Sequence, residues 1–171
     1  MSVKYHNFGG VIGWNLQKYF PNLSSDSYLK LQRSTRNKLQ QEYIDYFLST
    51  DEPPMPLVVN LETINRCNST CSFCTANKNA EKRPYRRMED SLFYSIIDQL
   101  ADWGYTGHLT LYGNNEPFLD TRIVEFHKYC REKLPHSFIF LSSNGLLLTV
   151  DKVKEIIPYV NQLIINNYCR D

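Results

Sequence analysis

The stretch Cys67-Asn68-Ser69-Thr70-Cys71-Ser72-Phe73-Cys74 carries three thiols at C-x3-C-x2-C spacing. It directly follows an apolar run at residues 57–64, and this arrangement predicts a short buried strand that ends in a cysteine loop. Thiolates are soft ligands, which select iron–sulfur clusters, zinc or Cu(I). The sequence therefore predicts a metal centre at the end of a strand.

The number of thiols helps to distinguish the possible metals. A structural zinc site has four protein ligands, and a four-iron cluster that only carries electrons is usually held by four cysteines. This loop offers three, and Cys130 and Cys169 lie far along the chain. Three thiolates on a four-iron cluster leave one iron able to bind a small molecule.

The loop resembles that of the radical S-adenosylmethionine (SAM) enzymes, whose signature is C-x3-C-x-Φ-C with an aromatic residue at Φ. Cys67, Cys71, Phe73 and Cys74 match this signature. The resemblance implies that the three cysteines bind a [4Fe-4S] cluster and that Phe73 lies against the adenine of SAM. It also implies a reaction in which the reduced cluster passes an electron to SAM, giving a 5′-deoxyadenosyl radical that abstracts hydrogen from a substrate.

Composition and charge narrow the function classes. A chain of 171 residues has the length of one domain, and its formal net charge of +1 gives no reason to expect nucleic acid. No apolar run has the length needed to span a bilayer, and the N-terminal residues lack the features of a signal peptide. The clustered cysteines are unlike a secreted disulfide framework, so we expect a cytoplasmic protein without membrane partners.

A proline-rich segment, Asp51-Glu52-Pro53-Pro54-Met55-Pro56, marks the best boundary in the chain, because proline cannot continue a helix. Before it, polar caps at 24–26 and spaced apolar residues predict a helix. We therefore expect an N-terminal helical extension with a proline-rich linker over residues 1–56, and a core over residues 57–171.

The core alternates strands and helices. After the cysteine loop, the pattern predicts helices at 90–103, at 120–133 with Asp120 as its cap, and from Thr149 onward. The first of these helices has one apolar face, made of Leu92, Phe93, Ile96, Ile97, Leu100 and Trp103. Strands are predicted at 108–112, 138–141 and 162–165, and they are apolar enough to be covered on both faces.

This alternation predicts an α/β fold with a parallel sheet and right-handed crossovers. With the resemblance, it indicates a partial (βα) barrel of the radical SAM type, with about four βα units and an N-terminal helical extension. The family core usually has six units. The resemblance covers residues 57–171 and stops after the fourth strand, so we expect a fragment of a longer chain.

Polar residues follow each predicted strand, and the carboxyl ends of parallel strands meet at one edge of a barrel. We therefore expect the cysteines to share a face with the later strand ends. The residues concerned are Asn114, Asn115 and Glu116 after the second strand, Ser143 and Asn144 after the third, and Asn166 and Asn167 after the fourth.

The resemblance assigns SAM contacts to these strand ends. Asn114-Asn115-Glu116-Pro117 resembles the family's Gly-Gly-Glu-Pro motif with both glycines replaced. Glu116 is expected to accept hydrogen bonds from the SAM ammonium, or else to be a carboxylate at a helix start. The third and fourth strand ends are expected to contact the carboxylate or ribose of SAM, and their alternative role is to make turns.

Two other classes of function stay open from the sequence. The three loop thiols plus Cys169 or a partner's thiol could close a non-catalytic iron–sulfur site, or zinc could stabilise an interaction domain. Cys130 is expected to be a buried small hydrophobe, and the histidines show no metal-binding spacing. The charged segment at 78–87 is either a solvated loop or a dock for an acidic reductase, such as a flavodoxin or ferredoxin. The substrate cannot be read from the residues.

Overall fold

The computed structural model describes residues 25–51, 53–74 and 83–166. It contains a parallel sheet of β1 (Val58–Asn60), β2 (His108–Thr110), β3 (Phe138–Ser143) and β4 (Gln162–Ile165). The strands lie in the order β1-β2-β3-β4. Registers such as Val58 opposite His108 and His108 opposite Phe138 align the strands, so that their carboxyl ends lie at one edge.

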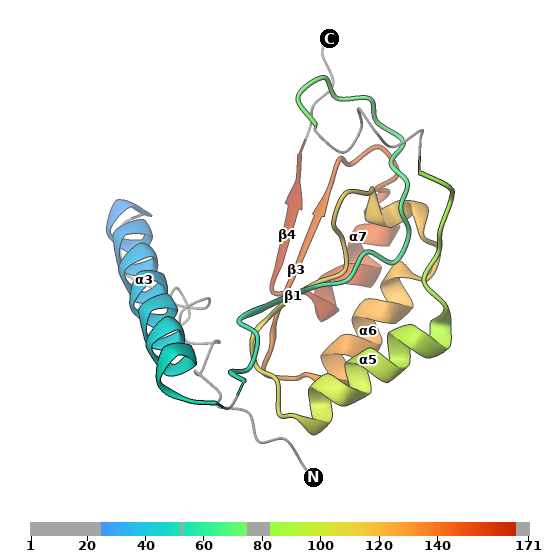
Figure 1. Cartoon of the computed structure of the whole chain (residues 1–171). Helices are drawn as coiled ribbons and strands as arrows, with labels where there is room; N and C mark the ends of the chain where they lie inside the picture. The colour runs from blue at the N-terminus through green and yellow to red at the C-terminus, as the bar shows by residue number, and fades with distance from the viewer. Residues whose placement is uncertain (1–24, 52, 75–82, 167–171) are drawn as a thin grey trace.

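Three helices connect these strands and lie on one side of the sheet (Figure 1): α5 (Asp90–Asp102), α6 (Ile123–Lys133) and α7 (Val150–Ile156). Short 3-10 helices, η1 (Pro117–Leu119) and η2 (Ile157–Tyr159), stand before α6 and after α7. The strands are added in sequential order, and right-handed crossovers in such an order place every connecting helix on the same face. The predicted α/β fold with about four βα units is confirmed.

The N-terminal helix α3 (Ser25–Ser49) agrees with the predicted extension and lies to the side of the sheet (Figure 1). Its exposed face includes Phe47 and Leu48, which are 62% and 76% exposed. The segment that follows brings Met55 into the core, where it is 3% exposed. The division at residue 56 stays a prediction.

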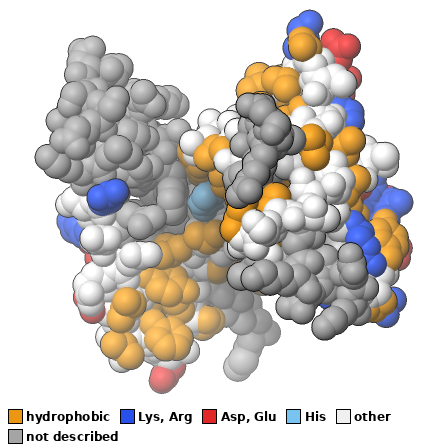
Figure 2. All heavy atoms as spheres, turned by 90° about the horizontal axis from the view of Figure 1, so that it is seen from above, with side chains coloured by type: hydrophobic (Ala, Val, Ile, Leu, Met, Phe, Trp, Pro, Cys, Tyr) orange, Lys and Arg blue, Asp and Glu red, His pale blue; other side chains and the backbone are white. Residues whose placement is uncertain are grey.

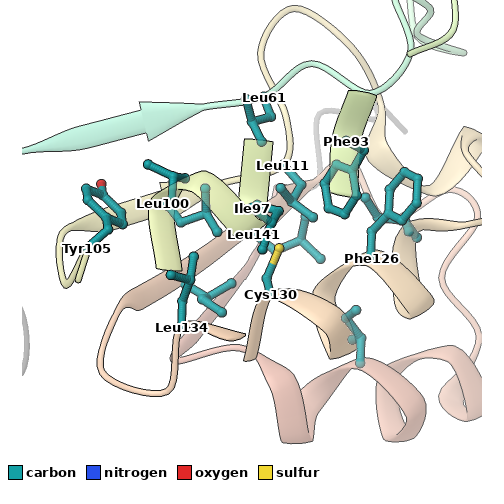
Figure 3. Close-up of a cluster of buried hydrophobic side chains, with 14 of the residues drawn as sticks. Leu61, Phe93, Ile97, Leu100, Tyr105, Leu111, Phe126, Cys130, Leu134 and Leu141 are labelled. Carbon is teal, nitrogen blue, oxygen red and sulfur yellow. The ribbon is translucent and has the colours of Figure 1, made fainter. Parts of the chain in front are cut away.

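The core lies between the helices and the inner face of β2 and β3. Phe93 and Ile97 of α5 point toward Leu111 and Leu141 from the sheet (Figure 3), and all four are fully buried. The rings of Phe93 and Phe126 stack with centroids 3.8 Å apart, which joins α5 to α6. Burying side chains of this size contributes about 1.5–3 kcal/mol each.

The other face of the sheet carries a row of aromatic rings. His108, Phe138 and Phe140 form edge-on ring pairs there, and Phe140 continues the row to Tyr112. The helices α5, α6 and α7 lie on the opposite side of the sheet, and α3 is the described helix that stands on this side (Figure 1). In the edge strand β4, Ile164 shares this face with Phe140 and is 36% exposed. The described helices that follow the strands cover one face, and on the other face Phe138 is 7% exposed. Coverage of the strands on both faces therefore stays a prediction.

Some local predictions also need correction. Leu92 and Trp103, predicted on the inner face of α5, are 52% and 41% exposed, because the face that meets the sheet is narrower than the apolar pattern. Asp120 does not cap α6, whose preceding residue is Arg122. The Asp120 carboxylate instead accepts from the Arg122 side chain at 2.8 and 2.9 Å. Thr149 caps α7 as predicted, accepting a hydrogen bond from the Lys152 N–H.

Candidate functional site

A cavity of about 330 Å³ opens at the carboxyl ends of the strands. Figure 2 views the molecule from the end toward which the strands of Figure 1 point, and it shows hydrophobic side chains at the surface among polar ones. The volume lies in the range of small-molecule sites, roughly 300–1,000 Å³. The lining residues come from the cysteine loop and from the ends of three strands: Cys67, Ser69, Cys71, Phe73, Cys74, Tyr112, Gly113, Asn115, Glu116, Ser142, Ser143, Asn144 and Asn166.

The chain on either side of the cysteine loop is paired, which fixes where the loop begins. Ile64 forms an antiparallel bridge with Arg87, and the Met88 N–H donates to the Thr63 carbonyl at 2.8 Å. Asn65 is buried and its side chain donates to the Pro84 carbonyl at 2.8 Å. The segment that leaves the first strand is therefore held by the segment that precedes α5.

Glu62 links the cysteine loop to the end of β2. One carboxylate oxygen accepts from the Asn114 N–H at 2.7 Å, and the other lies 3.3 Å from the Arg83 guanidinium. A Cβ on Gly113 would lie 3.0 Å from the Glu62 carboxylate. Glycine at 113 therefore lets the backbone of the second strand end approach this side chain closely.

Glu116 joins the second strand end to the third. It is 2% exposed, and its carboxylate accepts from the Ser143 hydroxyl at 2.8 Å, the Asn144 N–H at 2.8 Å and the Phe118 N–H at 3.2 Å. A buried carboxylate needs such donors. The bond to Phe118 makes Glu116 the cap of η1, so its predicted alternative role at a helix start is observed.

The three loop thiols have the setting of ligands rather than of disulfides. Cys67, Cys71 and Cys74 are free and partly buried. Burial raises the pKa of the Cys67 thiol, while the Ser69 N–H, 3.4 Å from the sulfur, opposes the shift. Loading a metal on this thiol releases its proton, because the thiolate is the ligand.

The donor set fits a four-iron cluster. Within the described ranges, no three side chains converge on the position of one metal ion. The three sulfurs line one cavity instead, as expected when each binds a different iron. Cys67, Cys71 and Cys74 are thus the residues that would hold the cluster.

The structure gathers most of the predicted residues at the cavity and separates one of them. Asn115, Glu116, Ser143, Asn144 and Asn166 line the cavity with the cysteines and Phe73. Asn114 does not line it, since its backbone turns toward Glu62. Asn167 and Cys169 lie outside the described residues. Four further lining residues were not predicted: Ser69, Tyr112, Gly113 and Ser142. Tyr112 is the last residue of the strand predicted at 108–112, and Ser142 directly follows the strand predicted at 138–141, so both could be found from their place at a strand end.

Comparison with known proteins identifies the family. The model of the radical SAM superfamily matches residues 61–166, which include the cysteine loop and all later strand ends. The chain belongs to the radical SAM superfamily. Radical SAM proteins are enzymes whose cofactors are a [4Fe-4S] cluster and SAM, so membership agrees with the predicted cofactors.

The radical SAM chain is similar in sequence to a curated enzyme and in structure to BtrN. The S-adenosyl-L-methionine-dependent 2-deoxy-scyllo-inosamine dehydrogenase of Niallia circulans is 22% identical over 99 residues, covering 58% of this chain and 39% of the relative. The crystal structure of BtrN in an open conformation has a TM-score of 0.59 at 20% identity, covering 68% of this chain and 51% of BtrN.

The structure of BtrN in complex with AdoMet and 2-DOIA gives a TM-score of 0.59 at 19% identity, covering 65% and 45% of the two chains. The radical SAM chain thus spans about half the length of the solved relatives. Among the described residues, no helix is long and apolar enough to cross a membrane.

Proposed function

We propose that this chain binds a [4Fe-4S] cluster through Cys67, Cys71 and Cys74, and positions SAM against it for reductive cleavage. The observation that carries the proposal is the shared cavity, where the three thiols lie beside the ends of the second, third and fourth strands. When reduced, the cluster would supply the electron that cleaves SAM, and the adenosyl radical would abstract hydrogen from a substrate of the full-length protein.

The chain's own residues would place SAM. Phe73 is 64% exposed at the cavity, so its ring can cover the adenine by stacking. Glu116 already accepts three hydrogen bonds. We therefore propose that Glu116 shapes the SAM site mainly by holding the backbone of residues 116–118 and 143–144 in place, with Asn115, Ser143 and Asn166 facing the ligand.

The electron donor is proposed to be a flavodoxin or ferredoxin. Supporting this, the segment that follows the cysteine loop carries exposed Arg86 and Arg87 beside the exposed ring of Tyr85. A cationic surface beside the cluster loop favours encounter with an acidic protein. A reducing compartment such as the cytoplasm suits both the cluster and such a donor.

Anaerobic reconstitution with iron and sulfide tests the proposal. We expect about four irons per chain, a change in the electron paramagnetic resonance (EPR) spectrum of the reduced cluster when SAM is added, and 5′-deoxyadenosine after dithionite. A four-iron cluster with no response to SAM would favour the non-catalytic module. Bound zinc without labile sulfide would favour the zinc-stabilised domain.

Phe73 provides a sharper test of SAM placement. Phe73→Ala should weaken SAM binding about two- to tenfold, since an aromatic stacking contact contributes roughly 0.5–1.5 kcal/mol. Phe73→Tyr keeps the flat ring and should bind SAM as the wild type does. Affinity is measured from the EPR change on titrating SAM into the loaded chain. Equal affinities in the alanine and tyrosine variants would exclude the stacking role.

A further inference from the structure

Asn144 reaches from the end of β3 to the cysteine loop. Its side-chain nitrogen lies 2.8 Å from the Asn68 side-chain oxygen, 3.3 Å from the Ser69 hydroxyl and 3.9 Å from the Cys67 sulfur. Its side-chain oxygen accepts from the Leu146 N–H at 3.0 Å. Because a backbone N–H can only donate, the oxygen must face Leu146 and the NH2 group must face the loop.

A closed ring of hydrogen bonds holds this amide in place. The Asn144 N–H donates to one oxygen of Glu116, whose own N–H donates to the Arg66 carbonyl at 2.8 Å. Arg66 is covalently joined to Cys67, which the Asn144 side chain contacts. Ser143 supports the ring by donating its hydroxyl to the other oxygen of Glu116. A donor fixed from both sides keeps its direction when the charge on its acceptor changes.

We propose that Asn144 is a positioning residue that donates a hydrogen bond to the cluster-bound thiolate of Cys67 and thereby raises the reduction potential of the cluster. The inference rests on the proposed function, because it needs the cluster to be bound. A thiolate is a stronger acceptor than the thiol. Hydrogen bonds to the sulfurs are among the determinants of cluster potential, since a donor stabilises the extra negative charge of the reduced state.

The geometry distinguishes this role from that of simply tying the loop to β3. Asn144 has two side-chain N–H groups and three acceptors within reach, so one group can serve Asn68 while the other turns toward Ser69 and Cys67. Cys67 also accepts from the Ser69 N–H. A purely structural tie would affect how much cluster is held, and it would leave the potential of the held cluster unchanged.

The test is an EPR-monitored potentiometric titration of the full chain, loaded anaerobically and measured without SAM. Asn144→Ala removes the donor and should shift the potential to more negative values. Asn144→Asp keeps an acceptor for the Leu146 N–H but turns a carboxylate oxygen toward the thiolate, so its shift should be larger in the same direction. Asn144→Ser, whose hydroxyl cannot reach the sulfur, should resemble alanine.

Asn166→Ala is the matched control. Asn166 lines the same cavity, but its side chain donates to the Ser142 hydroxyl at 2.9 Å and not to the cysteine loop. The reduction potential of the cluster in the Asn166→Ala variant should equal that in the wild type. The proposal is overturned if the Asn144 variants hold a cluster at the wild-type potential, or if all three lose the cluster while the wild type keeps it. Failure of the wild type to hold four irons would instead count against the proposed function.

Discussion

The chain places cysteines in two contrasting regions, the loop at 67–74 and the helix α6. The loop thiols lie partly exposed at a cavity, whereas Cys130 is fully buried between α6 and the sheet (Figure 3). Burial raises the pKa of Cys130 and offers its sulfur no space for iron. The same side chain is therefore available as a ligand in one region and is a core residue in the other, and packing makes the difference.

The largest expected effect concerns metal retention. Cys71→Ala should abolish cluster binding, because the two thiolates that remain in the loop are too few to hold a four-iron cluster. Cys130→Ala should retain about four irons per chain. Iron and labile sulfide are measured after anaerobic reconstitution and desalting. Equal loss from both variants would contradict the assignment of the loop as the ligand set.

The next largest difference is expected in the rates at which the thiols of the two regions are alkylated. In the chain without a cluster, we expect iodoacetamide to alkylate the loop thiols much faster than Cys130, because Cys130 must await local opening of the core. Peptide mass spectrometry over time gives the rate at each site. Urea at denaturing concentration is the control, since it should make the rates similar. Rapid alkylation of Cys130 without denaturant would show that α6 packs more loosely than described.

A smaller effect, on the free energy of unfolding, is expected when His127 is protonated at low pH. His127 lies one turn before Cys130. Its Nδ1–H donates to the Ile123 carbonyl at 2.7 Å, its ring is fully buried, and burial lowers its pKa to about 4. The unfolded chain binds this proton near pH 6.5. The neutral ring therefore stabilises the fold fully above about pH 6.5, and that stability falls as the pH drops from there toward 4.

Urea unfolding at pH 7 and pH 4.5 measures this effect. His127 should account for a loss of about 2 kcal/mol in the free energy of unfolding between the two pH values. His127→Gln keeps a donor toward Ile123 and cannot titrate, so its pH dependence should be smaller by that amount. An unchanged pH dependence in the variant would show that His127 is protonated in the folded chain.

The smallest effect is expected from Cys130→Ala on stability. Removing one buried sulfur should lower the free energy of unfolding by about 1 kcal/mol, through lost packing and a small cavity. Cys71→Ala in the chain without a cluster should cost less, because Cys71 is only partly buried. Urea unfolding under reducing conditions checks both values. The reverse order would mean that the loop contributes packing as well as ligands.

The sequence by itself determined the βα order, the family signature in the cysteine loop and the helix starting after Thr149, because these depend on spacing and capping within short stretches. It also predicted that the strand ends would meet. The sequence could not decide which of two adjacent residues at a strand end faces the cavity. In the structure, Asn115 lines the cavity and Asn114 does not. That choice depends on Glu62, which is 52 positions away and binds the Asn114 N–H.

Tertiary structure likewise decided that Leu92 and Trp103 are exposed and that the Glu116 carboxylate serves two strand ends at once. Local periodicity records which residues are apolar, but contact with the sheet selects the few that are covered. Hydrogen bonds between strand ends depend on the register of strands that are distant in sequence. Spacing along the chain therefore determined the chemistry of the site, and only the packed sheet decided its geometry.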